Sequence, residues 1–308
     1  MLINRRLLLR SGAPALAAAA LLPAHAFAAD PRRARASDII VKDVNGLAVL
    51  SGAGCNVVAL AGPDGALLVD GGRAVNAAVL RKAVSDAVKT SRVHTLINTH
   101  WHPEQVGSNE AVGKAGGVIV AHDVTRLYLG RDSHSALYDG VIKALPPAAR
   151  PTKVTFNTGS VDFAGETVEY RYLPAAHTNG DLFVHFPKHN VMAVGGPVSA
   201  VRWPVMDYQN GAFMHGFVRS YEILASVAKP DTIIVPADGP TLTGADIVRQ
   251  RDMYWALFKQ LFADFNKGFG PTDVIEARPL KDHEAQFGDP AQFLEAAYRS
   301  IQLATVPH

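Results

Sequence analysis

The sequence has almost no cysteine and no excess of charge of either sign. Cys55 is the single cysteine in 308 residues, so an intrachain disulfide and a cysteine-based zinc finger are both excluded. The 30 basic and 28 acidic side chains nearly balance, which argues against a nucleic-acid groove. No repeat of fixed period follows residue 30. With 48% hydrophobic residues, the chain has enough apolar material for the core of a soluble globular protein.

No hydrophobic run near the N-terminus is long enough for a permanent membrane anchor. The segment begins with three arginines, Arg5, Arg6 and Arg10. A run rich in alanine and leucine follows, and its length of about 12 residues is well below the roughly 20 needed to cross a bilayer. Small residues at 24–28 offer cleavage points, and the arginine pair fits twin-arginine export, with ordinary secretion as the alternative. We predict a signal over 1–28, a linker over 29–37, a single domain over 38–308, and a periplasmic or secreted protein.

Short apolar runs separated by turns alternate with helical segments in the rest of the chain. Residues 38–70 predict a β-meander, 75–91 an amphipathic helix and 94–98 a buried strand. Further strands are predicted near 152–157, 161–163, 166–173, 181–186, 190–194 and at the start of 232–240, with helices around 213–228 and 243–267. This order predicts one α/β domain of two packed sheets with helices outside.

His100 and His102 are the most distinctive candidates for chemistry. They lie two residues apart at the end of a short predicted strand, so both imidazoles can face one ion. A third histidine from elsewhere in the chain would complete a tetrahedral site with one open position. A histidine pair of this kind is weak evidence by itself, because such pairs also occur as packing or surface features.

Several separate motifs, taken in order, resemble the metallo-β-lactamase fold hydrolases. They are the residues 70–72, 98–103, 107–109, 177–181 and 235–240. The resemblance covers roughly residues 40–240 and implies a four-layer αββα sandwich. In that family, loops along one edge of the two sheets hold one or two metal ions.

The resemblance implies a complete first metal site and an altered second one. The first-site ligands fall on His100, His102 and His177. The usual second-site positions hold Glu104, Gln105, Gly196 and Asp238, none of which is the family's ligand. We therefore expect one zinc ion per chain, with the second site either empty or occupied by a hard cation through carboxylate oxygens.

From these residues we predict a zinc-dependent hydrolase of an ester, thioester or lactam-like bond in a small-molecule substrate. A zinc ion on three histidines lowers the pKa of its bound water from about 15.7 to near 7, which makes metal-bound hydroxide available. Glu104 is the predicted base, and Asp238 is predicted to orient substrate or water. Both carboxylates could instead accept hydrogen bonds from the ligand histidines.

Two other functions stay open at this point. The altered second-site positions also suit a decayed hydrolase that serves as a binding or regulatory module, because a fold does not establish chemistry. A mononuclear iron dioxygenase needs two histidines and a carboxylate. Gly196 removes the carboxylate that the family's oxygenases use, so this function requires Glu104 or Asp238 as a substitute. No sequence feature specifies an oligomeric state.

Overall fold

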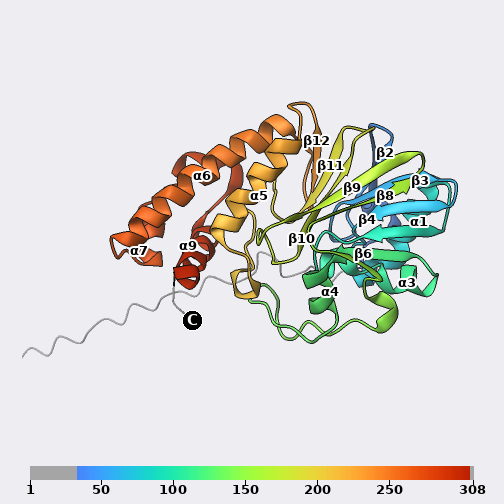
Figure 1. Cartoon of the computed structure of the whole chain (residues 1–308), viewed down its shortest axis with the longest axis horizontal. Helices are drawn as coiled ribbons and strands as arrows, with labels where there is room; N and C mark the ends of the chain where they lie inside the picture. Colours follow the sequence, from blue (N-terminus) through green and yellow to red (C-terminus); the bar gives the residue numbers. More distant parts are fainter. Residues whose placement is uncertain (1–32, 306–308) are drawn as a thin grey trace, which may run out of the picture.

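Two β-sheets form the centre of the molecule in the computed structural model, which describes residues 33–305 (Figure 1). The first sheet has seven strands in sequence order: β1 (Ile40–Val44), β2 (Leu47–Ser51), β3 (Val57–Gly62), β4 (Gly65–Val69), β5 (Val93–Ile97), β6 (Val118–His122) and β7 (Lys153–Thr155). Strands β1 to β4 pair antiparallel, and β4 to β7 pair parallel. The predicted meander is confirmed.

The second sheet has six strands in the order β13-β12-β11-β10-β9-β8. Their bounds are β8 (Thr158–Phe163), β9 (Glu166–Leu173), β10 (Asp181–Phe186), β11 (Val191–Gly195), β12 (Ile233–Pro236) and β13 (Leu242–Thr243). Neighbouring strands are antiparallel except β11 and β12, which are parallel. The strands predicted in the second half of the sequence are therefore present, and β8 begins three residues earlier than predicted.

Helices connect and flank the strands. The α-helices are α1 (Ala77–Val88), α2 (Pro103–Val106), α3 (Asn109–Lys114), α4 (Asp123–Leu129), α5 (Met214–Val227), α6 (Gly244–Asn266), α7 (Pro271–Glu276), α8 (Glu284–Phe287) and α9 (Ala291–Thr305). Short 3-10 turns are η1 (Ala36–Asp38), η2 (Ala74–Asn76), η3 (Pro147–Ala149), η4 (Tyr208–Asn210) and η5 (Lys281–His283). Helix α1 is shorter than the predicted 75–91, because Lys89 takes a left-handed conformation (φ 59°) that ends it.

The space between the two sheets is filled by apolar side chains from both. Leu67 and Val69 of β4 meet Leu182 and Val184 of β10 in this inner cluster, and all four are buried. Alternate residues of a strand face the same side, so every second residue of these strands contributes to the layer. Burial of each such side chain stabilises the fold by about 1.5–3 kcal/mol.

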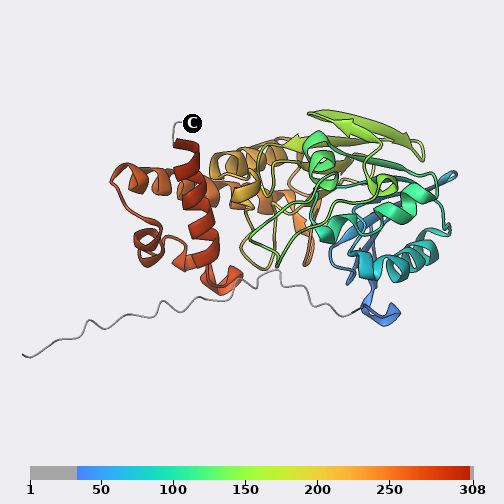
Figure 2. The same cartoon turned by 90° about the horizontal axis from the view of Figure 1, so that it is seen from below.

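Helices cover the outer face of each sheet, which confirms the predicted αββα sandwich. Helices α1 and α3 bury Leu80, Val84 and Val112 against the first sheet. Helices α5, α6 and α9 pack in one large cluster against the second sheet. In Figures 1 and 2 the C-terminal helices α6, α7 and α9 extend beyond the sheets at one end of the molecule.

Loops from both sheets meet at one edge of the sandwich. Strands β4, β5 and β6 are parallel, so the residues that follow them emerge on the same side. Two backbone hydrogen bonds join the sheets there: Leu182 N donates to the Thr99 carbonyl (2.7 Å), and Asn56 N donates to the Ala237 carbonyl (2.6 Å). These bonds hold the loop after β5 against β10 and the loop after β12 against the segment before β3.

The predicted export signal, residues 1–28, lies outside the described residues. Of the predicted linker, residues 33–37 are described, and they lead into the turn η1. Between residues 33 and 305, no helix combines the length and the apolar character needed to cross a bilayer.

The packing of α6 in the cluster that it forms with α5 and α9 can be tested by mutation. Leu261 is fully buried, whereas the next residue, Phe262, is 45% exposed. Leu261→Ala should lower the free energy of unfolding by about 2–5 kcal/mol, because it leaves a cavity. Phe262→Ala should change it by about 0.5 kcal/mol. Chemical denaturation measures both, and equal costs would contradict the described orientation of α6.

Candidate metal centre

A cavity of about 980 Å³ opens at the edge where the loops of the two sheets meet. Its lining includes the three histidines named above together with Glu104, Gln105, Gly196 and Asp238. All the predicted site residues are thus brought to one cavity, although they come from both halves of the sequence. The cavity is the candidate functional site.

His100 is held by a chain of hydrogen bonds that begins at Asp70. The Thr99 hydroxyl donates to Asp70 Oδ2 (2.8 Å), so it can only accept from the His100 ring, whose Nδ1 lies 3.0 Å away. The proton of His100 is therefore on Nδ1, and Nε2 carries the lone pair. Burial raises the pKa of Asp70 to about 7, against the hydrogen bonds from Thr99 that lower it.

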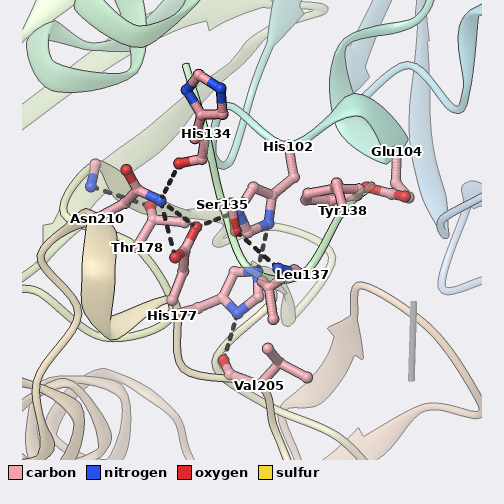
Figure 3. Close-up of polar contacts among 12 residues, drawn as sticks. His102, Glu104, His134, Ser135, Leu137, Tyr138, His177, Thr178, Val205 and Asn210 are labelled. Carbon is pink, nitrogen blue, oxygen red and sulfur yellow. Dashed lines mark hydrogen bonds and ion pairs between the residues drawn. The ribbon is translucent and has the colours of Figure 1, made fainter. Parts of the chain in front are cut away.

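His177 lies in the loop between β9 and β10, which Asp181 organises. The Asp181 carboxylate accepts hydrogen bonds from the backbone N–H groups of His177 (2.7 Å) and Thr178 (2.8 Å). The His177 ring donates from Nδ1 to the Val205 carbonyl (2.5 Å), as Figure 3 shows. A carbonyl oxygen only accepts, so the lone pair of this ring is on Nε2.

His102 is oriented by an aspartate that the sequence did not single out. Its Nε2 lies 3.2 Å from Asp207 Oδ2, and both side chains are 2% exposed. Asn210 donates to both Asp207 oxygens (2.9 and 3.0 Å) and to the His134 carbonyl (2.9 Å). Burial acts to raise the pKa of Asp207, but the hydrogen bonds and charge of its neighbours hold it below the usual value. The ionised carboxylate keeps the His102 proton on Nε2.

The three histidines each turn one ring nitrogen toward one point. Their ligand atoms all lie within 4.8 Å of one another, and His102 Nδ1 is 2.9 Å from His177 Nε2 (Figure 3). Burial, followed by the neighbouring histidines, holds the pKa of His100 well below its usual value and lowers that of His177 to about 3. Ring nitrogens that converge at this distance repel one another unless a proton or a cation lies between them. The residues therefore fit a metal ion, with one hydrogen-bonded nitrogen on each ring.

Glu104 lies in the cavity wall, but both of its oxygens have partners. Arg73 forms an ion pair with Oε1, and the Tyr138 hydroxyl donates to Oε2 (2.7 Å). The Glu104 side chain is 7% exposed and that of Arg73 18%. Burial, followed by the charge of Glu104, raises the pKa of Tyr138 well above its usual value, so this hydroxyl stays protonated.

The other altered positions also lack the geometry of a second metal site. Asp238 forms an ion pair with Arg202 (2.5 Å) at the cavity wall, where its side chain is 37% exposed. A Cβ atom on Gly196 would lie 2.3 Å from Cδ2 of His177, so the described position of this ring leaves no room for a side chain there. Among residues 33–305, His100, His102 and His177 are the one group with metal-ligand spacing.

Sequence reasoning missed four residues of this site, for one reason. They are Arg73, Tyr138, Arg202 and Asp207. Each lies in a loop without a recognisable motif, and its partner is distant in the sequence. The one available signal is that Arg73 directly follows the motif at residues 70–72.

A comparison with protein families identifies the chain. The family model described as the metallo-beta-lactamase superfamily matches residues 50–241. The chain belongs to this superfamily. No curated protein matches it.

Solved structures of the metallo-beta-lactamase fold resemble the chain at low sequence identity. A metallo-beta-lactamase from Pontibacter korlensis is 19% identical, with a TM-score of 0.54 over 70% of this chain and 93% of that one. The DIM-1 metallo-beta-lactamase is 15% identical, with a TM-score of 0.55 over 71% and 98%. The stereoselective inverting sec-alkylsulfatase Pisa1 from Pseudomonas sp. is 16% identical, with a TM-score of 0.63 over 88% of this chain and 52% of the sulfatase. These likenesses support the metallo-beta-lactamase fold.

Asp207 should matter for metal affinity although it does not face the converging nitrogens. Asp207→Ala removes the acceptor that keeps the His102 proton on Nε2, so the affinity for a divalent metal should fall about 10–100-fold. Gln209→Ala, an exposed position two residues away, is the matched control and should leave the affinity unchanged. Competition with a fluorescent chelator measures both. Equal affinities in the two variants would contradict the role of Asp207.

Proposed function

We propose that this chain is a mononuclear zinc-dependent hydrolase that cleaves an ester, thioester or lactam-like bond. The observation that carries the proposal is the convergence of three histidines in a cavity large enough for a small molecule. Three imidazole ligands with one position left open are typical of catalytic zinc. The similar solved structures, two metallo-beta-lactamases and a sec-alkylsulfatase, support a small-molecule substrate.

The proposed chemistry divides between the ion and the chain. Zinc on three histidines supplies Lewis acidity and makes a water molecule acidic near neutral pH. Asp70, Asp207 and Asp181 keep the three rings in place, by hydrogen bonds to Thr99, to the His102 ring and to the loop of His177. These carboxylates position the ligands and do not touch the substrate in this proposal.

Glu104 is the proposed proton acceptor. It would accept the proton at Oε2, the oxygen that takes the hydrogen bond from Tyr138, while Arg73 holds Oε1 in place. Tyr138 must then rotate its hydroxyl away, because a protonated carboxyl oxygen no longer accepts in the same way. Asp238 is proposed to orient the substrate through Arg202, its ion-pair partner in the cavity wall.

One ion per chain follows from the partners of the carboxylates. Glu104 is engaged by Arg73 and Tyr138, and Asp238 is engaged by Arg202. A second cation would have to displace an arginine from either carboxylate, and like charges repel at these distances. This argument supports an empty second position over a hard cation there.

A binding or regulatory module is the second candidate function, and one observation favours it. Both oxygens of Glu104 already have partners, so the proposed base must break a contact before it can accept a proton. A binding module does not require Glu104 to break a contact or to accept a proton. Its metal would serve to hold a ligand.

We also propose that the protein is exported from the cytoplasm. The arginine pair and the short apolar run of residues 1–28 support export to the periplasm or the medium. A hydrolase of small molecules is consistent with that location.

Removing one ligand should abolish metal binding and turnover together. His100→Ala leaves two imidazoles, so the zinc content should fall from about one ion per chain to almost none, and any hydrolysis should disappear with it. Elemental analysis after dialysis measures the metal, and a panel of ester, thioester and lactam substrates measures turnover. His283→Ala, in the 3-10 turn η5 and outside the cavity lining, is the control. A folded wild-type protein that holds no zinc would overturn the proposal.

Substitution of Glu104 distinguishes the hydrolase from the binding module. If Glu104 is the base, Glu104→Gln should lower kcat by about 10²–10⁴-fold at an unchanged zinc content. Glu110→Gln removes the same charge from an exposed position of α3 and should have no effect. A wild-type protein that binds zinc but shows no turnover on the panel would favour the binding module.

A further inference from the structure

One loop contacts the metal centre although it does not line the cavity. Residues 131–145 lie between α4 and η3, and the described lining of the cavity includes none of them. Ser133 and Ile142 pair across this loop, and the backbone N–H of each donates to the carbonyl of the other (2.9 Å). The Leu145 N–H donates to the Leu129 carbonyl at the end of α4 (2.9 Å). These bonds give the 131–145 loop a defined shape.

The 131–145 loop holds the aspartate that orients His102. The Ser135 hydroxyl donates to the Asp207 carboxylate, and Ser135 is 5% exposed. The Asn210 amide connects Asp207 to the loop a second time, because it also donates to the His134 carbonyl. Asp207 Oδ2 lies 3.2 Å from His102 Nε2. A shift of the loop therefore moves the acceptor that orients a metal-ligand ring.

A second contact joins the loop to Glu104 and again to His102. The Tyr138 hydroxyl donates to Glu104 Oε2 (2.7 Å). The Tyr138 ring meets the His102 ring edge-on, with the ring centroids 5.4 Å apart. Figure 3 shows Ser135 and Tyr138 of the loop together with His102 and Glu104. Tyr138 thus touches both a metal ligand and the proposed proton acceptor.

The end of the loop packs near Trp101, which separates the two histidines of the pair in the sequence. The Trp101 ring is buried, stacks on Tyr128 of α4 (centroids 4.6 Å apart) and meets the His102 ring edge-on (4.6 Å). Ile142 and Leu145 of the loop pack against the apolar cluster that contains Trp101. The loop therefore supports His102 by apolar packing as well as by hydrogen bonds.

Metal binding and the support of His102 favour the same arrangement. Ring nitrogens that converge without a proton or a cation between them repel one another, so the rings need support from outside the cluster. For His102 this support comes from Asp207, Tyr138 and Trp101, and the loop either contains or contacts each of them. A metal ion between the nitrogens removes the repulsion and holds His102 where these contacts are made.

We propose that the shape of the 131–145 loop is coupled to metal occupancy of the three-histidine centre. The loop holds His102 in its ligand position, and metal binding stabilises the loop to the same extent, because coupling between two equilibria is reciprocal. Ser135 and Tyr138 are positioning residues, since they act through Asp207, Glu104 and the His102 ring. This inference rests on the proposed function, which places the metal at that site.

Hydrogen–deuterium exchange of the full chain with and without zinc tests the coupling. The Leu137 N–H donates to the Ser135 hydroxyl (3.2 Å) and the Tyr138 N–H to the Ser135 carbonyl (3.1 Å), so both amides report on the loop. Zinc should slow their exchange about 5–150-fold, the usual range of such coupling. The β8–β9 hairpin contributes no residue to the cavity lining and should not respond. A loop that does not respond, or that responds no more than this hairpin, overturns the proposal.

The affinity of the chain for zinc tests the reverse direction of the coupling. Ser135→Ala and Tyr138→Phe each remove one hydrogen bond to the site, so each should weaken zinc binding about 3–10-fold. Ser133→Ala removes a hydroxyl that donates to the Arg131 carbonyl within the loop, and as the control it should leave the affinity unchanged. Competition with a fluorescent chelator measures all three variants. An unchanged affinity in either Ser135→Ala or Tyr138→Phe overturns the proposal.

The double variant Ser135→Ala with Tyr138→Phe distinguishes coupling from a purely structural role. At saturating zinc its loop should exchange as fast as the metal-free loop of the same variant, because both hydrogen bonds to the site are absent. If the two hydroxyls served stability alone, zinc would still slow exchange in this variant, and that result overturns the proposal. Circular dichroism checks that the variant is folded.

The two proposals fail in distinguishable ways. A wild-type chain that binds one zinc ion without slowing exchange in the loop refutes this inference and leaves the metal centre intact. A chain whose loop responds to zinc but that shows no turnover on the substrate panel refutes the hydrolase and leaves the coupling intact. A folded chain that binds no zinc refutes both.

Discussion

Three imidazoles that face one another at short range are the constraint on which the site depends. Each ring forms a hydrogen bond with a group outside the cluster. These groups are the Thr99 hydroxyl, the Asp207 carboxylate and the Val205 carbonyl. The ring nitrogens that remain lie within 4.8 Å of one another. Nitrogens that converge at this range repel one another unless a proton or a cation lies between them. The cluster therefore fits a metal ion.

The two-sheet architecture makes that convergence possible. His100 and His102 follow β5 of the first sheet, whereas His177 precedes β10 of the second. Hydrogen bonds across the edge, such as Leu182 N to the Thr99 carbonyl, keep the two loops in register. Since the inner apolar layer holds the sheets together, the geometry of the metal centre depends on packing far from it.

Arginine side chains neutralise two carboxylates in the cavity wall. Glu104 and Asp238, the carboxylates at positions where the family has second-site ligands, each pair with an arginine. Their negative charge is thereby balanced by the chain itself, and an additional cation has little to gain. These two ion pairs therefore support the proposal of a single metal ion per chain.

The sequence alone determined the fold and the three candidate ligands. Apolar periodicity predicted nearly every strand and the main helices, because burial on a sheet or helix face is encoded locally, and the order of the motifs identified the histidines. Only the tertiary structure decided how the carboxylates are used. Glu104 is 31 residues from Arg73 and 34 from Tyr138, and His102 is 105 residues from Asp207. The placement of residues 33–38 beside the cavity is of the same kind. Such contacts depend on how loops pack against one another, and no local pattern of residues encodes that packing.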